Sequence, residues 1–129
     1  MATHKAACSC GQLRLIADGD PIRVSICHCL ECQRRTGSAF GLQGRWPSDR
    51  VDVTGPFTKY VRLSDDGERK TYRFCPECGA TVFWTTEGHD TVAIAIGSFA
   101  DRSFPQPSVS VYGSRRHAWL PLPDGIETY

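Results

Sequence analysis

Hydrophobic and polar residues alternate along most of the chain in short runs, as in RKTYRF at 69–74 and TVAIAI at 91–96. Alternation with a period of two is typical of β-strands that bury one face. The pattern predicts strands at 12–17, 23–27, 39–45, 51–54, 58–63, 69–74, 81–85, 91–96 and 108–112. Only Leu30–Thr36 and Ala100–Ser103 could form single helical turns. We therefore predict an all-β protein.

Turn-forming residues separate these runs. DGDP at 18–21, SDDGE at 64–68 and EGHD at 87–90 each stand between two alternating segments. Gly, Asp and Pro in these positions are typical of hairpin connections. The strongest predicted hairpin joins 58–63 to 69–74 through SDDGE.

Length and charge narrow the functional classes. A chain of 129 residues, 40% of them hydrophobic, matches one globular domain, which we expect to span 1–129. A net charge of +1 disfavours a nucleic-acid partner held by a strongly basic surface. The N-terminus lacks the apolar run of a secretory signal, and no stretch approaches the roughly 18 apolar residues of a membrane span. We expect a cytoplasmic protein with no membrane partner, and the pattern does not specify an oligomeric state.

The seven cysteines fall into three clusters. An odd number cannot pair completely in disulfides, and disulfides are rare in a reducing compartment, so metal binding is the favoured interpretation. Two close thiol pairs that converge can supply the four ligands of a structural zinc site. Cys8 with Cys10 and Cys75 with Cys78 form such pairs. The alternative is four buried free thiols.

The third cluster, Cys27, Cys29 and Cys32, offers only three thiolates. A metal held there keeps an open position, which is the property of catalytic zinc. His28 is expected to point away, although it could orient the ligands or complete the site. A second structural site closed by His28 or by a cysteine from another pair is the alternative. A redox dithiol is disfavoured because the βαβ context of thioredoxin-like motifs is missing.

Three motifs in this order give the chain a resemblance to a known family. They are CSCG at 8–11, CHCLECQRRTG at 27–37 and FCPECG at 74–79, followed by Gly97-Ser98-Phe99 and by Trp119. The chain resembles the glutathione-dependent formaldehyde-activating enzyme (GFA) family, also called the centromere protein V domain family. Such domains are similar to β-tent zinc proteins, in which a Cys₄ zinc ties antiparallel sheets together.

The resemblance implies two zinc ions per chain. The structural zinc would be held by four cysteines and the catalytic zinc by three: Cys8, Cys10, Cys75 and Cys78 for the first, and Cys27, Cys29 and Cys32 for the second. It also implies a carbon–sulfur lyase of the S-(hydroxymethyl)glutathione synthase type, whose partners are a small thiol such as glutathione and an aldehyde such as formaldehyde. Zinc would ionise the thiol or polarise the carbonyl.

The basic pair of the second motif is the candidate substrate-binding group. Arg34 and Arg35 could bind a glutathione carboxylate through their planar guanidinium groups. Gln33 shifts this pair by one position from the commonest family form. His89 and His117 are expected to be surface residues. A non-catalytic zinc β-module that binds a protein or another partner remains the alternative function, but such a module has no need of a second, three-cysteine cluster.

Overall fold

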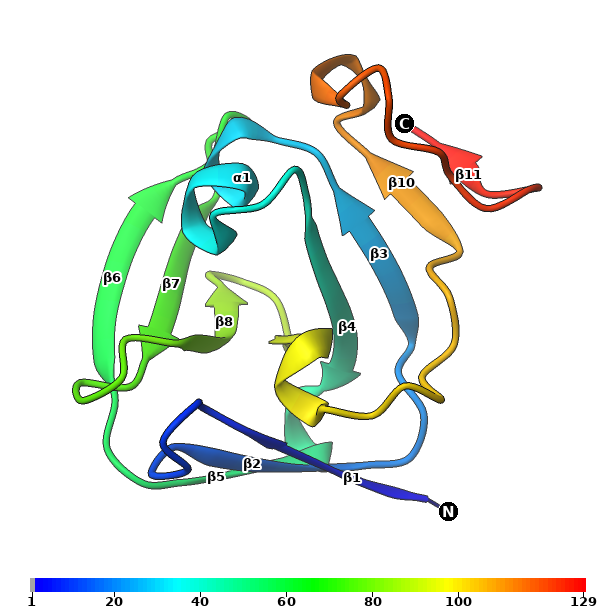
Figure 1. Ribbon diagram of the computed structural model, residues 1–129. Coiled ribbons are helices and arrows are strands. Elements are labelled where there is room, and N and C mark those ends of the chain that lie inside the picture. Colours follow the sequence, from blue (N-terminus) through cyan, green and yellow to red (C-terminus); the bar gives the residue numbers. More distant parts are fainter. Residues whose placement is uncertain (1) are drawn as a thin grey trace.

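A computed structural model describes residues 2–129, and its strands form two sheets (Figure 1). The three-stranded sheet has the order β1-β2-β5, and the eight-stranded sheet has the order β11-β10-β3-β4-β9-β8-β7-β6. The smaller sheet comprises β1 (Thr3–Ala7), β2 (Arg14–Asp18) and β5 (Val51–Thr54). The larger comprises β3 (Arg23–Cys27), β4 (Gly41–Pro47), β6 (Thr58–Leu63), β7 (Arg69–Phe74), β8 (Thr81–Thr86), β9 (Thr91–Ala95), β10 (Val109–Val111) and β11 (Glu127–Thr128).

The larger sheet curls over the smaller one, which crosses its base in Figure 1. The main core contains side chains of both sheets, with Trp46 and Ile94 fully buried on the larger sheet and Leu15 on the smaller. The Trp46 indole N–H donates to the Gly19 carbonyl oxygen at 3.0 Å, so the buried ring keeps a hydrogen bond. Burial of one face of each sheet explains the period-two alternation.

Short helical segments connect the strands. They are α1 (Leu30–Thr36) and the 3₁₀ turns η1 (Ser48–Arg50), η2 (Ile96–Phe99) and η3 (Gly113–Arg115). Among residues 2–129, no helix is long and apolar enough to cross a membrane.

The sequence-based prediction of an all-β fold is confirmed. All nine predicted strands are present, and the hairpin through SDDGE pairs Leu63 with Arg69 as expected. Two short strands, β1 and β11, were not predicted. The helix at Leu30–Thr36 is correct but lasts about two turns, whereas Ala100–Ser103 forms no helical turn because the 3₁₀ segment ends earlier, at Phe99.

The sheets are not wholly antiparallel. β10 pairs in parallel with β3 on one side and with β11 on the other, and every other pair is antiparallel. Residues 100–108 cross from η2 to the start of β3 before β10 begins, and this long connection permits a parallel partner that a hairpin cannot give (Figure 1).

Helix α1 lies close against β4, and glycines make this possible. Gly37 ends the helix in the left-handed conformation, with φ of 67°, and its N–H donates to the Gln33 carbonyl oxygen. A Cβ atom on Gly41 would lie 3.1 Å from Cys32 Cβ and 2.8 Å from Arg35 Nη2. The missing side chain therefore lets the cysteine-bearing helix approach the sheet.

Candidate metal centres and the adjoining cavity

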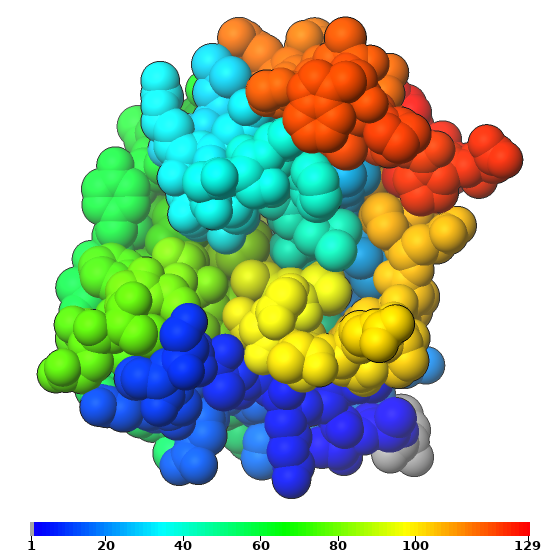
Figure 2. Space-filling model, viewed as in Figure 1, coloured from blue at the N-terminus to red at the C-terminus, as the bar shows by residue number. Residues whose placement is uncertain are grey.

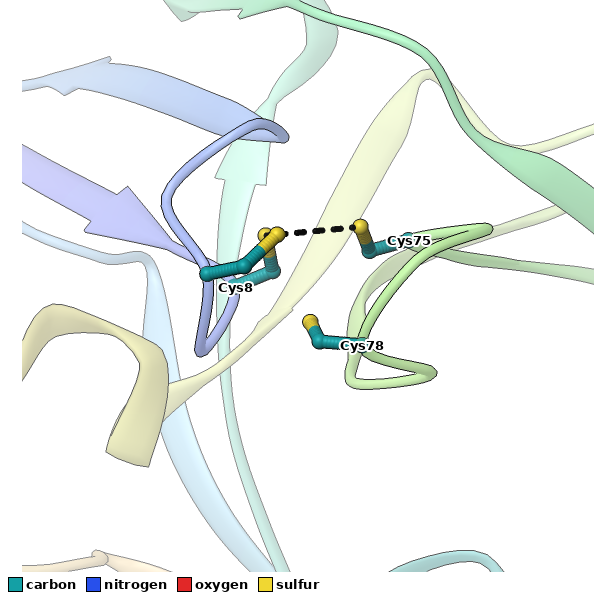
Figure 3. A group of neighbouring side chains, drawn as sticks. Cys8, Cys75 and Cys78 are labelled. Carbon is teal, nitrogen blue, oxygen red and sulfur yellow. Dashed lines mark hydrogen bonds between the residues drawn. The ribbon is translucent and has the colours of Figure 1, made fainter.

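The first cysteine cluster joins two loops that lie far apart in the sequence. Cys8 and Cys10 follow β1, whereas Cys75 and Cys78 lie in the turn between β7 and β8, so the cluster connects the smaller sheet to the larger. Figure 3 shows the thiols of Cys8, Cys75 and Cys78 pointing toward one another. The four sulfur atoms lie within 4.8 Å of one another.

The geometry of this cluster fits zinc. A Zn–S distance of about 2.3 Å in a tetrahedron places sulfur atoms about 3.8 Å apart. Cys10 Sγ lies 3.7 Å from Cys8 Sγ and 3.5 Å from Cys75 Sγ. Cys8 and Cys75 are also part of the main core, so the cluster closes one edge of that core.

Backbone N–H groups surround these thiols and favour thiolates. Leu13 N–H donates to Cys8 Sγ at 3.3 Å, and Glu77 N–H donates to Cys75 Sγ at 3.4 Å. Donation from backbone N–H groups of Ala80 and Cys10 lowers the pKa of the Cys78 thiol to about 6. Since a metal binds the thiolate form, such donors prepare the loops for a cation.

The second cluster lies where β3 meets α1. Cys27 is the last residue of β3, Cys29 caps the helix and Cys32 lies in its first turn. The Cys29 sulfur accepts a hydrogen bond from the Cys32 backbone N–H at 3.3 Å, as an N-cap side chain does. All three thiols are buried and their sulfur atoms lie within 4.8 Å of one another, a spacing that also fits one metal ion.

The three buried thiols differ in acidity. Hydrogen bonds from the Cys27 and Cys32 thiols lower the pKa of Cys29, with help from the Cys32 backbone N–H and the positive charge of Arg62. The same contacts raise the pKa of Cys27, because its thiol acts as the donor. The surroundings of Cys29 therefore favour its thiolate, which is the form that binds a metal.

A cavity of about 380 Å³ opens beside this second cluster. Its walls include all three cysteines and charged side chains from the larger sheet. Among the cavity-lining residues are Arg23, Ser25, Gln43, Arg45, Arg62, Lys70, Tyr72, Trp84, Tyr112 and Arg115. A cavity of this volume can hold a small organic molecule. Beside the first cluster, by contrast, Cys8 and Cys75 pack into the core.

The two arginines predicted to bind substrate lie in different surroundings. Arg34 lines the cavity, is mostly exposed and pairs with Glu31 at 3.2 Å. Arg35 is half-buried and is not among the described residues that line the cavity. Its guanidinium carbon lies 4.2 Å from the centroid of a Trp84 ring, and its Nη2 lies 3.8 Å from Cys32 Sγ.

The histidines lie outside the three-cysteine cluster. His28 is fully buried, and its Nε2 lies 2.9 Å from Ser110 Oγ on β10, so its side chain points away from the three thiols. Burial lowers the pKa of His28, which favours the neutral ring. His89 and His117 are exposed, as expected from the sequence.

Gln33, the departure from the common family motif, connects α1 to the C-terminal segment. Its Nε2 donates to the His28 carbonyl oxygen at 2.9 Å and to the Arg115 carbonyl oxygen at 3.2 Å. Its Oε1 lies 2.9 Å from His117 Nε2. The glutamine amide makes these contacts because its Nε2 donates and its Oε1 can accept. An arginine has no acceptor and could not replace it.

Several cavity residues were missed from the sequence. Arg62 and Tyr72 belong to β6 and β7, and neither lies near a cysteine motif in the chain. One sequence signal was available. Arg23, Ser25 and Cys27 are two residues apart, and residues two apart share a face of a strand, so Arg23 and Ser25 could have been predicted on the face that carries Cys27.

Fold and site together define a β protein with two cysteine clusters that can each hold a metal ion, one between its sheets and one beside a cavity. The sequence profile of the glutathione-dependent formaldehyde-activating enzyme (GFA) family matches residues 3–115. The chain belongs to the GFA family. A comparison with curated proteins finds no match.

A solved structure has the same fold. The crystal structure of a protein from Rhodobacter sphaeroides superposes with a TM-score of 0.55 at 16% sequence identity, over 73% of this chain and 85% of that chain. This similarity confirms the fold.

Proposed function

We propose that the protein is a zinc-dependent carbon–sulfur lyase that joins a small thiol, such as glutathione, to an aldehyde, such as formaldehyde. The observation that carries the proposal is the second cysteine cluster. Its three thiols, rather than four, lie together at the wall of a cavity of about 380 Å³. A three-ligand site leaves a position for substrate, and the cavity gives the substrate access to it.

The proposed reaction balances without a further reactant. The thiol sulfur forms a bond to the carbonyl carbon, the carbonyl π bond breaks, and the thiol proton ends on the new hydroxyl group. Bound zinc would supply a Lewis acid that favours thiolate at neutral pH or polarises the carbonyl. The reverse reaction releases the aldehyde.

The roles of the chain's own residues follow from their places. Cys27, Cys29 and Cys32 would hold the catalytic zinc, and the four cysteines between the sheets would hold the structural one. The largely buried Arg62 side chain, 15% exposed, places a positive charge near Cys29 that favours an anionic sulfur. Arg34 would bind a substrate carboxylate at the cavity rim.

Arg35 would have a less direct role than its neighbour. Because it lies between Trp84 and the Cys32 sulfur, it would hold that ligand and stabilise its thiolate. Arg35 would therefore affect substrate binding indirectly, by positioning the metal site.

Exchange spectroscopy by NMR tests the function. The uncatalysed addition of glutathione to formaldehyde is spontaneous, so the measurement compares exchange rates with and without zinc-loaded protein. We expect the wild-type protein to accelerate exchange. With Cys29→Ser, the exchange rate should equal the uncatalysed rate. Equal rates with and without wild-type protein for glutathione would reject this reaction and favour the non-catalytic zinc module.

A further inference from the structure

Cationic side chains gather at the end of the cavity away from the cysteines. In the larger sheet, Arg23 pairs with Arg45, Arg45 with Ala93, and Ala93 with Trp84. Directly paired residues point to the same face of a sheet, so this row places two arginines beside a small residue and a large ring. Both arginines line the cavity.

Lys70 lies on β7 of the same sheet, which β9 and β8 separate from the strand of Arg45. It lines the cavity and is half-buried, and its Nζ donates to Thr86 Oγ1 at 3.0 Å. Together with Arg23 and Arg45 it also lines a smaller hollow that continues past the end of the cavity. We call Arg23, Arg45 and Lys70 the distal cation cluster.

The cations of the distal cation cluster form no ion pair within the described part of the protein. Within residues 2–129, none of the three has a carboxylate oxygen within 4.0 Å. Glu68 is the acidic residue that lines the same end; it acts on Arg45 and Lys70 at longer range, and its carboxylate lies 2.8 Å from His89 Nε2. One carboxylate therefore faces three cations. Among the described residues, the side chains of Arg45 and Lys70 are half-buried and donate only to the hydroxyl groups of Thr91 and Thr86, whereas Arg23 is exposed. Half-buried cations without an ion-pair partner are costly, so the site favours an anion that enters from solution.

Two further polar groups in the cavity wall lack hydrogen-bond partners. Gln43 Oε1 and Arg62 Nε are buried and form no hydrogen bond among the described residues, although Arg62 Nε lies 4.0 Å from Glu31 Oε2. Buried polar atoms are usually paired, so unpaired ones that line a cavity indicate contacts made with a ligand. Both residues are neighbours of the distal cation cluster. Gln43 is two residues before Arg45 on β4 and so shares its face of the sheet, and Arg62 is paired with Lys70 between β6 and β7.

The spacing sets the length of such a ligand. Cys27 and Arg23 are four residues apart on β3, which corresponds to about 13 Å between their Cα atoms at a rise of about 3.4 Å per residue. Arginine and lysine side chains shorten this distance. A molecule with its reactive end at the cysteines and a charged group several bonds away can therefore contact both ends.

We propose that Arg23, Arg45 and Lys70 form an oxyanion-binding site that takes a carboxylate or a phosphate group. We propose further that this group is the remote end of the thiol substrate, a step that rests on the proposed function. Guanidinium and ammonium groups bind both kinds of oxyanion through charge-assisted hydrogen bonds. The site would make the protein select anionic thiols over neutral thiols of similar size.

Titration calorimetry at low ionic strength tests the oxyanion site, with inorganic phosphate and glutarate as probes because neither contains a thiol. We expect saturable binding to the zinc-loaded wild-type protein and at least tenfold weaker binding to the double variant R45Q/K70Q. The matched control is R14Q/K59Q, which removes two exposed cations that do not line the cavity. Tighter binding of phosphate would indicate a phosphorylated ligand, and tighter binding of glutarate would indicate a carboxylate.

Absence of saturable binding of either probe, or equal weakening in R14Q/K59Q, would overturn the oxyanion site. Circular dichroism confirms that each variant is folded, and K70Q alone replaces the double variant if that protein does not fold. The calorimetry uses no thiol or aldehyde, so its result tests the oxyanion site even if the proposed function is wrong.

The link to the substrate is tested by two thiols of similar size. We expect the wild-type protein to accelerate exchange of formaldehyde with 3-mercaptopropionate more than with 2-mercaptoethanol, and R45Q/K70Q to lose this preference. Equal acceleration of the two thiols would overturn the link. Acceleration of neither thiol would also overturn the link, whereas the exchange measurement with glutathione decides the proposed function and the calorimetry decides the oxyanion site.

Discussion

The two cysteine clusters use the same ligand atoms in opposite structural settings. The first brings together residues 65 positions apart, as between Cys10 and Cys75, and it joins loops of two different sheets at the edge of the main core. The second gathers Cys27, Cys29 and Cys32 from one continuous loop and lines a cavity. A metal in the first site closes a long chain loop, whereas a metal in the second closes a loop that is only six residues long.

This difference indicates which site supports the fold. Closing a long loop restricts the unfolded chain far more than closing a short one, and the first cluster also shares buried surface with the core. The second cluster is held by a β-strand and a helix cap that are adjacent in the sequence. In Figure 2 the α1 region lies at the opposite end of the molecule from the N-terminal strands, so the second site is remote from the base where the sheets meet.

The largest expected effect follows from breaking the first cluster. Cys75→Ser removes a fully buried thiol of the proposed structural zinc site, at the junction between the sheets. Structural zinc contributes roughly 10 to 16 kcal/mol in small zinc peptides, which is comparable to or larger than the net stability of about 5–15 kcal/mol of a domain. We expect insoluble or unfolded protein, measured by soluble yield and circular dichroism.

Glu77→Gln is the matched control, since Glu77 is exposed in the same turn and its side chain can change without loss of a ligand. It should fold like the wild type. A folded Cys75→Ser protein with an unchanged melting temperature would contradict the assignment of Cys75 to a structural zinc.

Breaking the second cluster should affect metal content and activity more than folding. Cys29→Ser removes a thiol from a local loop, so we expect the bound zinc to fall from two ions per chain to one while the melting temperature changes by only a few degrees. Metal analysis and thermal melting measure both quantities. Mild chelation of the wild-type protein should remove the same single ion.

The comparison with Cys75→Ser decides whether the two sites differ. If both serine variants unfold to the same extent, the division into a structural and a catalytic site is wrong. A closed module with two structural zincs then describes the protein better. Thiol-dependent activity that persists in a one-zinc Cys29→Ser protein would contradict the catalytic role of this loop.

Local sequence patterns predicted the strands and the cysteine clusters well. A strand with one buried face shows its alternation within a few residues, and a cysteine pair such as Cys75 and Cys78 can be recognised within four residues of sequence. The convergence of two distant pairs could be inferred because zinc requires four ligands. The short strands β1 and β11 were missed, since the two-residue β11 is too brief to show any alternation.

The cavity could not be predicted in the same way. Its wall contains residues from strands that are distant in the chain, and their alignment depends on the register of every intervening pair. The parallel placement of β10 beside β3 also depends on a long return segment without a sequence signature. For this reason Lys70 and Arg45 each appeared to be ordinary strand residues until the sheet was assembled.

The smallest effect is expected from a residue that attaches the second cluster to its neighbouring strand. Ser110 Oγ lies 2.9 Å from His28 Nε2, and both side chains are fully buried. Ser110→Ala leaves the imidazole without this partner, and its Nδ1 already has none among residues 2–129. An unpaired buried polar group costs about 1–3 kcal/mol, so denaturant unfolding should show a loss of this size.

This substitution also sharpens the contrast between the two clusters, because His28 lies between two cysteines of the second and is far from the first in the sequence. We expect Ser110→Ala to make one zinc ion more sensitive to chelation and to leave the other as tightly held as in the wild type. Ser114→Ala, at an exposed position of η3, is the control and should change neither stability nor chelation. If Ser110→Ala loosened both ions equally, the two sites would be coupled through the sheet, and the independence argued from their loop lengths would be wrong.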